Sequence, residues 1–202
     1  MSSLSKLTDA KVLGGIGALL VLLAAVPDVG LLLGISGLVL ILLAIRKISQ
    51  TVNDRSIYTN MRNAVLLGIG AIAVASITVA GAIYNVLGMG SFAGARFAFS
   101  PSIPVQQFFG LALIVVAGLV SIWVILLVSA VFVRRSYNSV ATKLNVDMFK
   151  TAGLLYLIGA ATAIIGVGFL IIFVSEILLA IAFFSIKEQP GTTEWQTVPA
   201  RN

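Results

Sequence analysis

Residues 12–47 read VLGGIGALLVLLAAVPDVGLLLGISGLVLILLAIRK, and this stretch decides the fold class. The run ends at the basic pair Arg46-Lys47, and the only charged residue before that pair is Asp28, which follows Pro27. A single helix of this length would measure roughly 50 Å, whereas the hydrocarbon core of a bilayer is about 30 Å thick. Proline removes a helical hydrogen-bond donor, and Pro-Asp is a common turn pair. The stretch therefore predicts a hairpin of two apolar helices that turns at Pro27-Asp28.

The remaining apolar segments place a second short pair after two longer ones. The second short pair turns near Gly166 and Gly168, where glycine tolerates the positive φ that a reversal needs. We predict an all-α transmembrane fold, a six-span helical bundle in which two short hairpins flank a longer central pair. The predicted spans are residues 12–26, 29–45, 64–88, 105–133, 151–167 and 168–186.

The basic residues orient these spans. The chain has 13 Lys and Arg residues, and with the N-terminus in the cytoplasm all of them except Arg96 fall on the cytoplasmic side. Residues 1–11 then form a cytoplasmic N-terminus, residues 12–186 the membrane domain, and residues 187–202 a disordered cytoplasmic tail. Glycines, prolines and phenylalanines in residues 89–104 predict a non-helical outer loop.

Two other topologies compete with six spans. Four long spans would place both basic linkers outside, which the positive-inside rule disfavours. Hairpins that enter and leave on the cytoplasmic side would preserve the same charge distribution, and they remain an alternative because each hairpin helix is only about 15 to 17 residues long, at the lower limit for crossing.

Composition argues against several function classes. Hydrophobic residues make up 59% of the chain and charged residues only 10%, which is too little charge for the surface of a soluble domain. The net charge of +6 indicates topology and attraction to anionic lipid headgroups before nucleic-acid binding. The absence of cysteine and histidine removes the usual ligands of zinc and iron–sulfur clusters and the usual nucleophile–base pairs. We expect no metal, no cofactor, no nucleic-acid partner and no enzymatic activity.

Each short hairpin is joined to the central pair by a basic linker. The first linker opens with Arg46-Lys47 and the second with Arg134-Arg135. At span ends their stems can lie along apolar surface while their charges meet anionic headgroups, so we predict these four residues as lipid-headgroup contacts. Apolar residues at positions 137–148 recur at helical spacing. This pattern fits a face on the membrane or on a partner, and it also fits an ordinary extension of the transmembrane helix.

Glu176 is an ionisable side chain well inside a predicted span. A charged residue at the centre of a membrane helix costs about 2.5–3.5 kcal/mol on insertion scales, so such a residue is a functional candidate. Glu176 is our candidate intramembrane ionisable site, for a proton, for a cation or for a salt bridge to another subunit. The alternative is a structural, protonated carboxyl group that is hydrogen-bonded to a neighbouring helix or to Ser175.

Several stretches resemble a known family. The sequences FKTAGLLYLIGA at residues 149–160 and LLAIAFFSIK at residues 178–187 are similar to the closing hairpin of an archaeal integral membrane family called domain of unknown function 996. The sequences LGGIGA at residues 13–18 and NDRSIY at residues 53–58 also fit its pattern, so the resemblance covers most of the chain. The resemblance implies an archaeal cell membrane and no assigned activity, and it supplies no catalytic residue.

These observations predict a multi-pass protein of the cell membrane that serves as a structural or accessory subunit of a membrane assembly. Its expected partners are membrane lipids and either further copies of itself or a larger membrane complex. The alternative is a small transporter or channel that uses Glu176 as its proton or cation site. Small residues four positions apart, such as Gly30 and Gly34, fit either dimerisation or packing within one bundle.

Overall fold

Helices account for every regular element that the structure describes. The computed structural model describes the backbone of residues 3–87 and 105–187 and the side chains of residues 6–84 and 108–187. The predicted outer loop with Arg96 and the predicted tail after residue 187 lie outside these ranges. The helices are α1 (Ser3–Leu22), α2 (Gly30–Thr51), α3 (Arg55–Leu87), α4 (Val105–Leu144), α5 (Met148–Thr162) and α6 (Gly168–Phe184), with short 3-10 helices η1 (Leu23–Ala25) after α1 and η3 (Ala163–Ile165) after α5.

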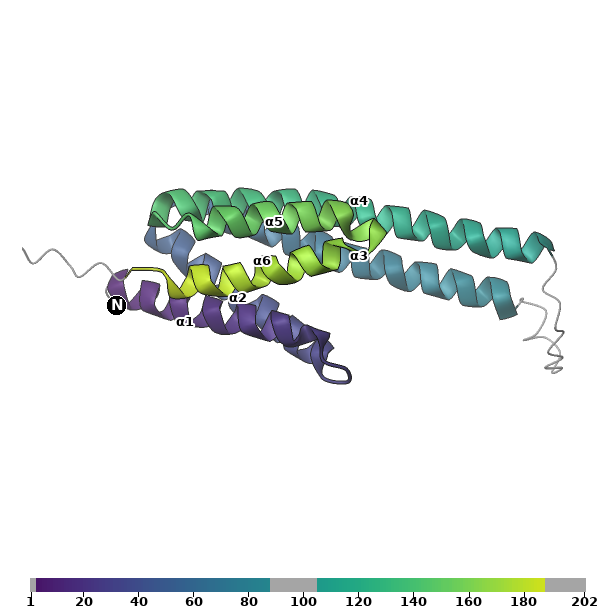
Figure 1. Cartoon of the computed structure of the whole chain (residues 1–202), viewed down its shortest axis with the longest axis horizontal. Coiled ribbons are helices and arrows are strands. Elements are labelled where there is room, and N and C mark those ends of the chain that lie inside the picture. Colours follow the sequence, from purple (N-terminus) through teal and green to yellow (C-terminus); the bar gives the residue numbers. More distant parts are fainter. Residues whose placement is uncertain (1–2, 88–104, 188–202) are drawn as a thin grey trace, which may run out of the picture.

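The helices pack as two short hairpins and one long pair (Figure 1). Helix α1 packs on α2, α3 on α4, and α5 on α6, while α2 contacts α3 and α4 contacts α5. Helix α1 also packs against α6, so the first and last hairpins meet and close the bundle. The beginning of α1, the α2–α3 connection and the α4–α5 connection lie at one end of the molecule, which we call the basic end because it carries both basic linkers.

Both hairpins reverse where the sequence predicts. Asp28 has φ 67° and Gly166 has φ 83°, so each turn places one residue in the left-handed region. Glycine adopts this conformation without a steric penalty, and aspartate tolerates it better than most residues. The two turns confirm the prediction that local chain chemistry sets the hairpin ends.

Small residues in the first hairpin allow its two helices to touch backbone to backbone. A Cβ atom on Gly37 would lie 2.5 Å from the Gly17 carbonyl oxygen. Because this oxygen belongs to the backbone, no side-chain rotation can remove the clash. Gly30 and Gly34 both face Ala24 in the same hairpin. These small residues therefore serve packing inside the bundle, which is the second of the two predicted uses.

The basic linkers are largely helical continuations of the preceding helices. Helix α2 runs on to Thr51 and α4 to Leu144, and the short breaks that follow contain Asn53 (φ 54°) and Asn145 (φ 53°). The apolar face of the second linker is buried in the bundle, where Val140 is fully inaccessible. Of the two alternatives, this burial bears out the extension of α4, whose apolar face packs inside the protein.

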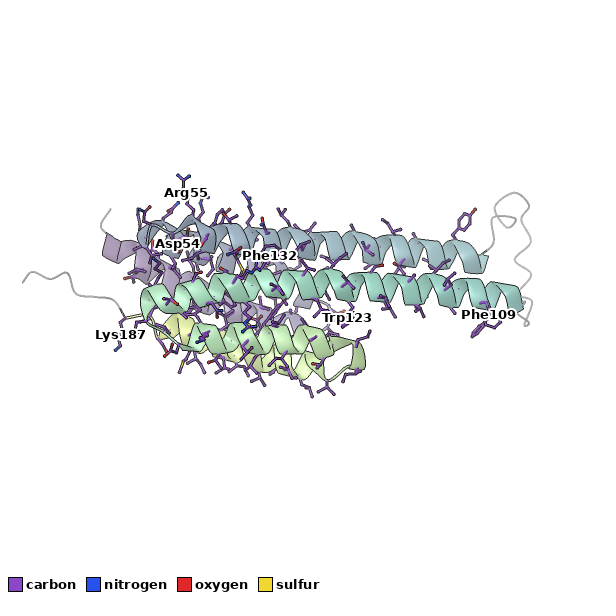
Figure 2. All side chains as sticks on the ribbon, turned by 90° about the horizontal axis from the view of Figure 1, so that it is seen from above. Asp54, Arg55, Phe109, Trp123, Phe132 and Lys187 are labelled. Carbon is purple, nitrogen blue, oxygen red and sulfur yellow. The ribbon has the colours of Figure 1, made fainter. Side chains whose placement is uncertain are left out.

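The central pair extends well beyond the turns of both hairpins (Figure 1). The Trp123 indole on α4 donates a 3.3 Å hydrogen bond to the Ala161 carbonyl, near the end of α5, and Figure 2 shows Trp123 beside that hairpin and Phe109 far beyond it. We call residues 77–87 of α3 and 105–119 of α4 the arm. Its two helices approach closely where Gly118 lies against Thr78.

The helix lengths agree with a membrane bundle without fixing the number of spans. By length and composition, five described helical segments are long and apolar enough to cross a membrane, and α6 is a shorter apolar helix. Six spans therefore stay a prediction, as does the cytoplasmic location of both termini.

Candidate functional site

Glu176 lies on α6 and is almost fully buried, with 9% of its surface exposed. Its neighbour Ser175 donates a hydrogen bond of 2.7 Å to the Ala152 carbonyl on α5. The next α5 residue, Gly153, packs against α4, and a Cβ atom there would lie 3.3 Å from the Arg134 Cα atom. Glu176 is therefore level with the basic pair of α4, near the basic end, although it lies at the middle of its own helix.

Two tyrosines share the bundle interior with Glu176. Tyr137 of α4 and Tyr156 of α5 both lie close enough to interact electrostatically with its carboxyl group. The Glu176 Oε2 atom is buried and has no hydrogen-bond partner among the described residues. Ser175 was one of the two hydrogen-bond partners that the structural alternative offered for Glu176, and its hydroxyl donates to α5 instead. A hydrogen-bond acceptor without a partner in this position can bind a proton or a cation.

Other buried hydroxyl groups near the basic end are used to join helices. Ser129 donates to the Ala64 carbonyl at 3.0 Å, and Ser136 donates to the Ile57 carbonyl at 2.8 Å, so two hydrogen bonds tie α4 to α3. No group of three or more acidic, histidine or cysteine side chains gathers within the described ranges in a way that would hold a metal ion. Glu176 is thus a single buried carboxyl group among helices that serine hydroxyls join, and its Oε2 atom takes no part in those hydrogen bonds.

The predicted headgroup contacts are not equivalent. Lys47 donates to the Asp9 carboxylate at 2.6 Å, so its charge is already paired within the chain. The Arg46 guanidinium lies over the Tyr58 ring at 5.9 Å from the centroid, and both Arg46 and Arg135 are exposed. Arg134 is half-buried in the packing between α4 and α5. Of the four, Arg46 and Arg135 are the exposed residues, and the Arg135 guanidinium lies 5.9 Å from the centroid of the Phe132 ring.

A polar hollow at the basic end was not anticipated from the sequence. It has a volume of about 240 Å³ and lies between the α2–α3 connection and the last turns of α4. Hydrogen bonds from the Ser56 hydroxyl and amide hold the pKa of the Asp54 carboxyl below its usual value, so Asp54 is charged at neutral pH. We call this space the Asp54 hollow, and its lining residues are Asp54, Asn138, Ser139, Thr142 and Lys143.

The sequence contains one local signal for this hollow. The order Asp54-Arg55-Ser56 places an aspartate directly before the first residue of α3, where its side chain accepts hydrogen bonds from the first turn. The other wall comes from α4, more than 80 residues later in the chain, so no local pattern connects the two.

Comparison with known proteins places the chain in a family. The sequence profile of a family described as "Protein of unknown function (DUF996)" matches residues 33–177, which is most of the chain. The chain belongs to the DUF996 family. The matched range includes Asp54, Asn138 and Glu176, and it contains the predicted family stretches at residues 53–58 and 149–160 but not those at 13–18 and 178–187.

A relative in an archaeon agrees with this DUF996 assignment. The chain is 33% identical over 183 residues to "Uncharacterized protein MJ1644" of Methanocaldococcus jannaschii, and the alignment covers 91% of this chain and 94% of that protein. The resemblance to an archaeal family of unknown function is therefore confirmed. No solved structure matches the chain.

Proposed function

We propose that this DUF996 protein is a non-enzymatic structural or accessory component of a cell-membrane assembly. The observation that carries the proposal is the arm, whose two helices present large apolar side chains that no other element in the described part of the chain covers. Ile77 and Leu113 are each 71% exposed and Phe109 is 67% exposed. An apolar surface of this kind binds lipid tails or the apolar face of another membrane protein.

The length of the apolar surface supports contact with a protein. Residues 105–133 of α4 span about 43 Å at the helical rise, whereas a bilayer core is about 30 Å thick. The hairpins reach only part of that length, because both turn beside the middle of the central pair (Figure 1). A second membrane protein or a second copy packed against the arm covers the excess apolar surface.

Photo-crosslinking tests this proposal in native membranes. A photoreactive amino acid at Phe109 or Leu113 should give one discrete protein adduct, which mass spectrometry identifies as a second copy or as another protein. The matched control is Leu31, which is 74% exposed near the tip of the first hairpin and should react mainly with lipid. If both arm positions gave lipid adducts alone, the accessory proposal would be wrong.

The proposal includes six spans with the basic end in the cytoplasm. Ser56 lies in the first turn of α3 and Ser139 lines the Asp54 hollow, both at the basic end, so cysteines introduced there should react with a membrane-impermeant reagent only from the cytoplasmic side. A cysteine at Ser100, in the predicted outer loop, should react only from outside. Labelling of position 56 from outside would refute this orientation.

A small transporter or channel is the second candidate, and the unpartnered Oε2 atom of Glu176 is the observation that favours it. Reconstitution in liposomes separates the two functions. The accessory proposal expects no proton or cation flux above protein-free liposomes, and it expects Glu176→Gln to fold normally because the amide keeps the shape and hydrogen-bonding capacity of the carboxyl group. A flux that Glu176→Gln abolishes would support transport and contradict the accessory function.

A further inference from the structure

The Asp54 hollow has walls of opposite charge. The Asp54 carboxylate and the Lys143 ammonium are near enough to interact electrostatically, yet no direct ion pair joins these two described residues. The space between and around them, about 240 Å³, corresponds to the liquid volume of about eight water molecules. It can hold a molecule that places a cation near Asp54 and an anion near Lys143.

The other lining groups accept hydrogen bonds. The Ser139 hydroxyl donates to the Arg135 carbonyl at 3.2 Å and the Thr142 hydroxyl to the Asn138 carbonyl at 3.0 Å, so their protons are used within α4 and lone pairs remain. The Asn138 Oδ1 atom is buried without a partner in the described structure. A buried acceptor without a partner costs stability, and a ligand N–H group would remove that cost once the Asn138 side chain, which lines the hollow, turns its Oδ1 atom toward the ligand. These acceptors favour a primary ammonium, which has three N–H donors, over a quaternary ammonium, which has none.

The loop that carries Asp54 is fixed in place. The Asp54 amide donates to the Ser49 carbonyl at 3.0 Å, and the Ser49 hydroxyl donates to the Asp54 carbonyl at 2.7 Å. The Asp54 Oδ1 atom accepts hydrogen bonds from the Ser56 amide at 3.0 Å and the Ser56 hydroxyl at 2.6 Å. None of these bonds uses Oδ2, so a preorganised carboxylate oxygen is left for a ligand.

We propose that the Asp54 hollow binds a small zwitterion, with a primary ammonium held by Asp54 and Asn138 and an anionic group held by Lys143. Asn138 and Lys143 lie about 5–13 Å beyond the Arg134-Arg135 pair along α4. The headgroup layer adds roughly 5–8 Å to each side of a bilayer core. The hollow therefore lies at the level of the lipid headgroups. Phosphoethanolamine carries both required charges, and it can reach the hollow either as the headgroup of a membrane phospholipid or as a soluble molecule.

The test uses the full-length protein in phosphatidylcholine nanodiscs. Calorimetric titration with O-phosphoethanolamine measures the binding of the soluble molecule. Native mass spectrometry of nanodiscs that also contain phosphatidylethanolamine measures how many molecules of this lipid the protein retains. Saturable binding of the soluble probe, or selective retention of phosphatidylethanolamine, supports the site and identifies its source. Phosphocholine and inorganic phosphate each lack the primary ammonium and should bind at least about tenfold more weakly than O-phosphoethanolamine. Absence of binding to both probes, or equal binding of phosphocholine, would overturn the site.

Substitutions locate the binding. Asp54→Asn removes the charge but keeps an oxygen that can cap α3, because Asn and Asp are equally good caps. This variant, Lys143→Gln and Asn138→Ala should each weaken binding at least about tenfold, and Asn138→Ala should not lower the thermal stability of the ligand-free protein. The controls Asp147→Asn and Lys150→Gln make the same charge changes at the basic end outside the hollow and should bind like the wild type. Equal losses in the controls would mean that general charge, and not this site, binds the probe.

Discussion

The basic end and the arm contain the same kinds of apolar residues, but these side chains are buried at the basic end and exposed in the arm. At the basic end six helices meet, and Ile45, Phe149 and Phe183 have no exposed surface. In the arm α3 and α4 are the only elements among the residues that the structure describes, and Phe109 keeps 67% of its surface exposed. The basic end therefore behaves like the core of a folded domain, whereas the arm depends on an apolar environment supplied from outside the chain. The same substitution should thus have different effects in the two regions.

The largest expected difference concerns phenylalanine. The Phe183 ring packs edge-on against Phe149 with 5.0 Å between centroids, so Phe183→Ala should lower the free energy of unfolding by about 3–5 kcal/mol. Phe109→Ala should change it little, because lipid or detergent surrounds this side chain in folded and unfolded protein alike. Denaturation with SDS in mixed micelles, followed by circular dichroism, measures both. Equal losses would show that the arm has a packed core of its own.

A smaller difference is expected for glycine. Gly37→Ala would force a methyl group against the Gly17 backbone and should cost about 1–3 kcal/mol of stability. At Gly70, on the outer surface of α3, a Cβ atom would meet nothing within 4 Å. Gly70→Ala should therefore be neutral or stabilise the protein by up to about 1 kcal/mol through helix propensity. The same SDS titration checks both variants, and a destabilised Gly70→Ala would reveal a partner surface at α3.

Serine offers a finer comparison. Ser136→Ala removes the buried hydrogen bond to the Ile57 carbonyl and leaves that acceptor without a partner, which should cost about 1 kcal/mol. Ser121 follows the arm on α4, on the side of the basic end, and donates to the Ala117 carbonyl of its own helix. Because Ser121→Ala leaves the helical backbone bonds intact, we expect no measurable change in the midpoint of thermal unfolding. A comparable fall in both variants would contradict the role of Ser136 as a link between α3 and α4.

The smallest effect is a dependence of stability on pH that belongs to the basic end. The hydrogen bonds from Ser56 lower the pKa of Asp54 from its usual value of 3.8, so the carboxylate stabilises the folded protein above that pH and loses this effect as the pH falls through the lowered pKa. The described part of the arm contains no carboxylate. We expect the small stability difference between wild type and Asp54→Asn to shrink below about pH 4. Thermal unfolding at pH 3 and pH 6 measures it, and a difference that grows in acid would contradict this sign.

Both hairpin turns and the all-helical fold were predictable because their causes are local. Pro27 interrupts an apolar run before Asp28, and Gly166 supplies the positive φ of the second turn. The helix of the second linker was recognisable from its spacing as well. Where the apolar face of the second linker packs was not predictable, because a helical period shows that a face exists and does not show which helices cover it.

The candidate sites were only partly predictable for the same reason. Glu176 was identified because a carboxyl group in an apolar run is conspicuous. Its position along the bundle, level with Arg134, depends on how far the short hairpin reaches beside the longer helices. The pairing of Lys47 with Asp9 and the Asp54 hollow both join residues far apart in the chain. No spacing rule brings such residues together.

The sequence by itself determined that the chain folds into apolar helices, where the hairpins turn and which residues form the basic end, because hydrophobicity, charge and turn chemistry act over a few neighbouring residues. Only the tertiary structure decided that the hairpins end beside the middle of the central pair, that Glu176 lies level with Arg134, and that Asp54 faces Lys143. These features follow from the offsets between packed helices, and such offsets are set by contacts such as Gly17 with Gly37 and Ser175 with Ala152 that form only when distant segments meet.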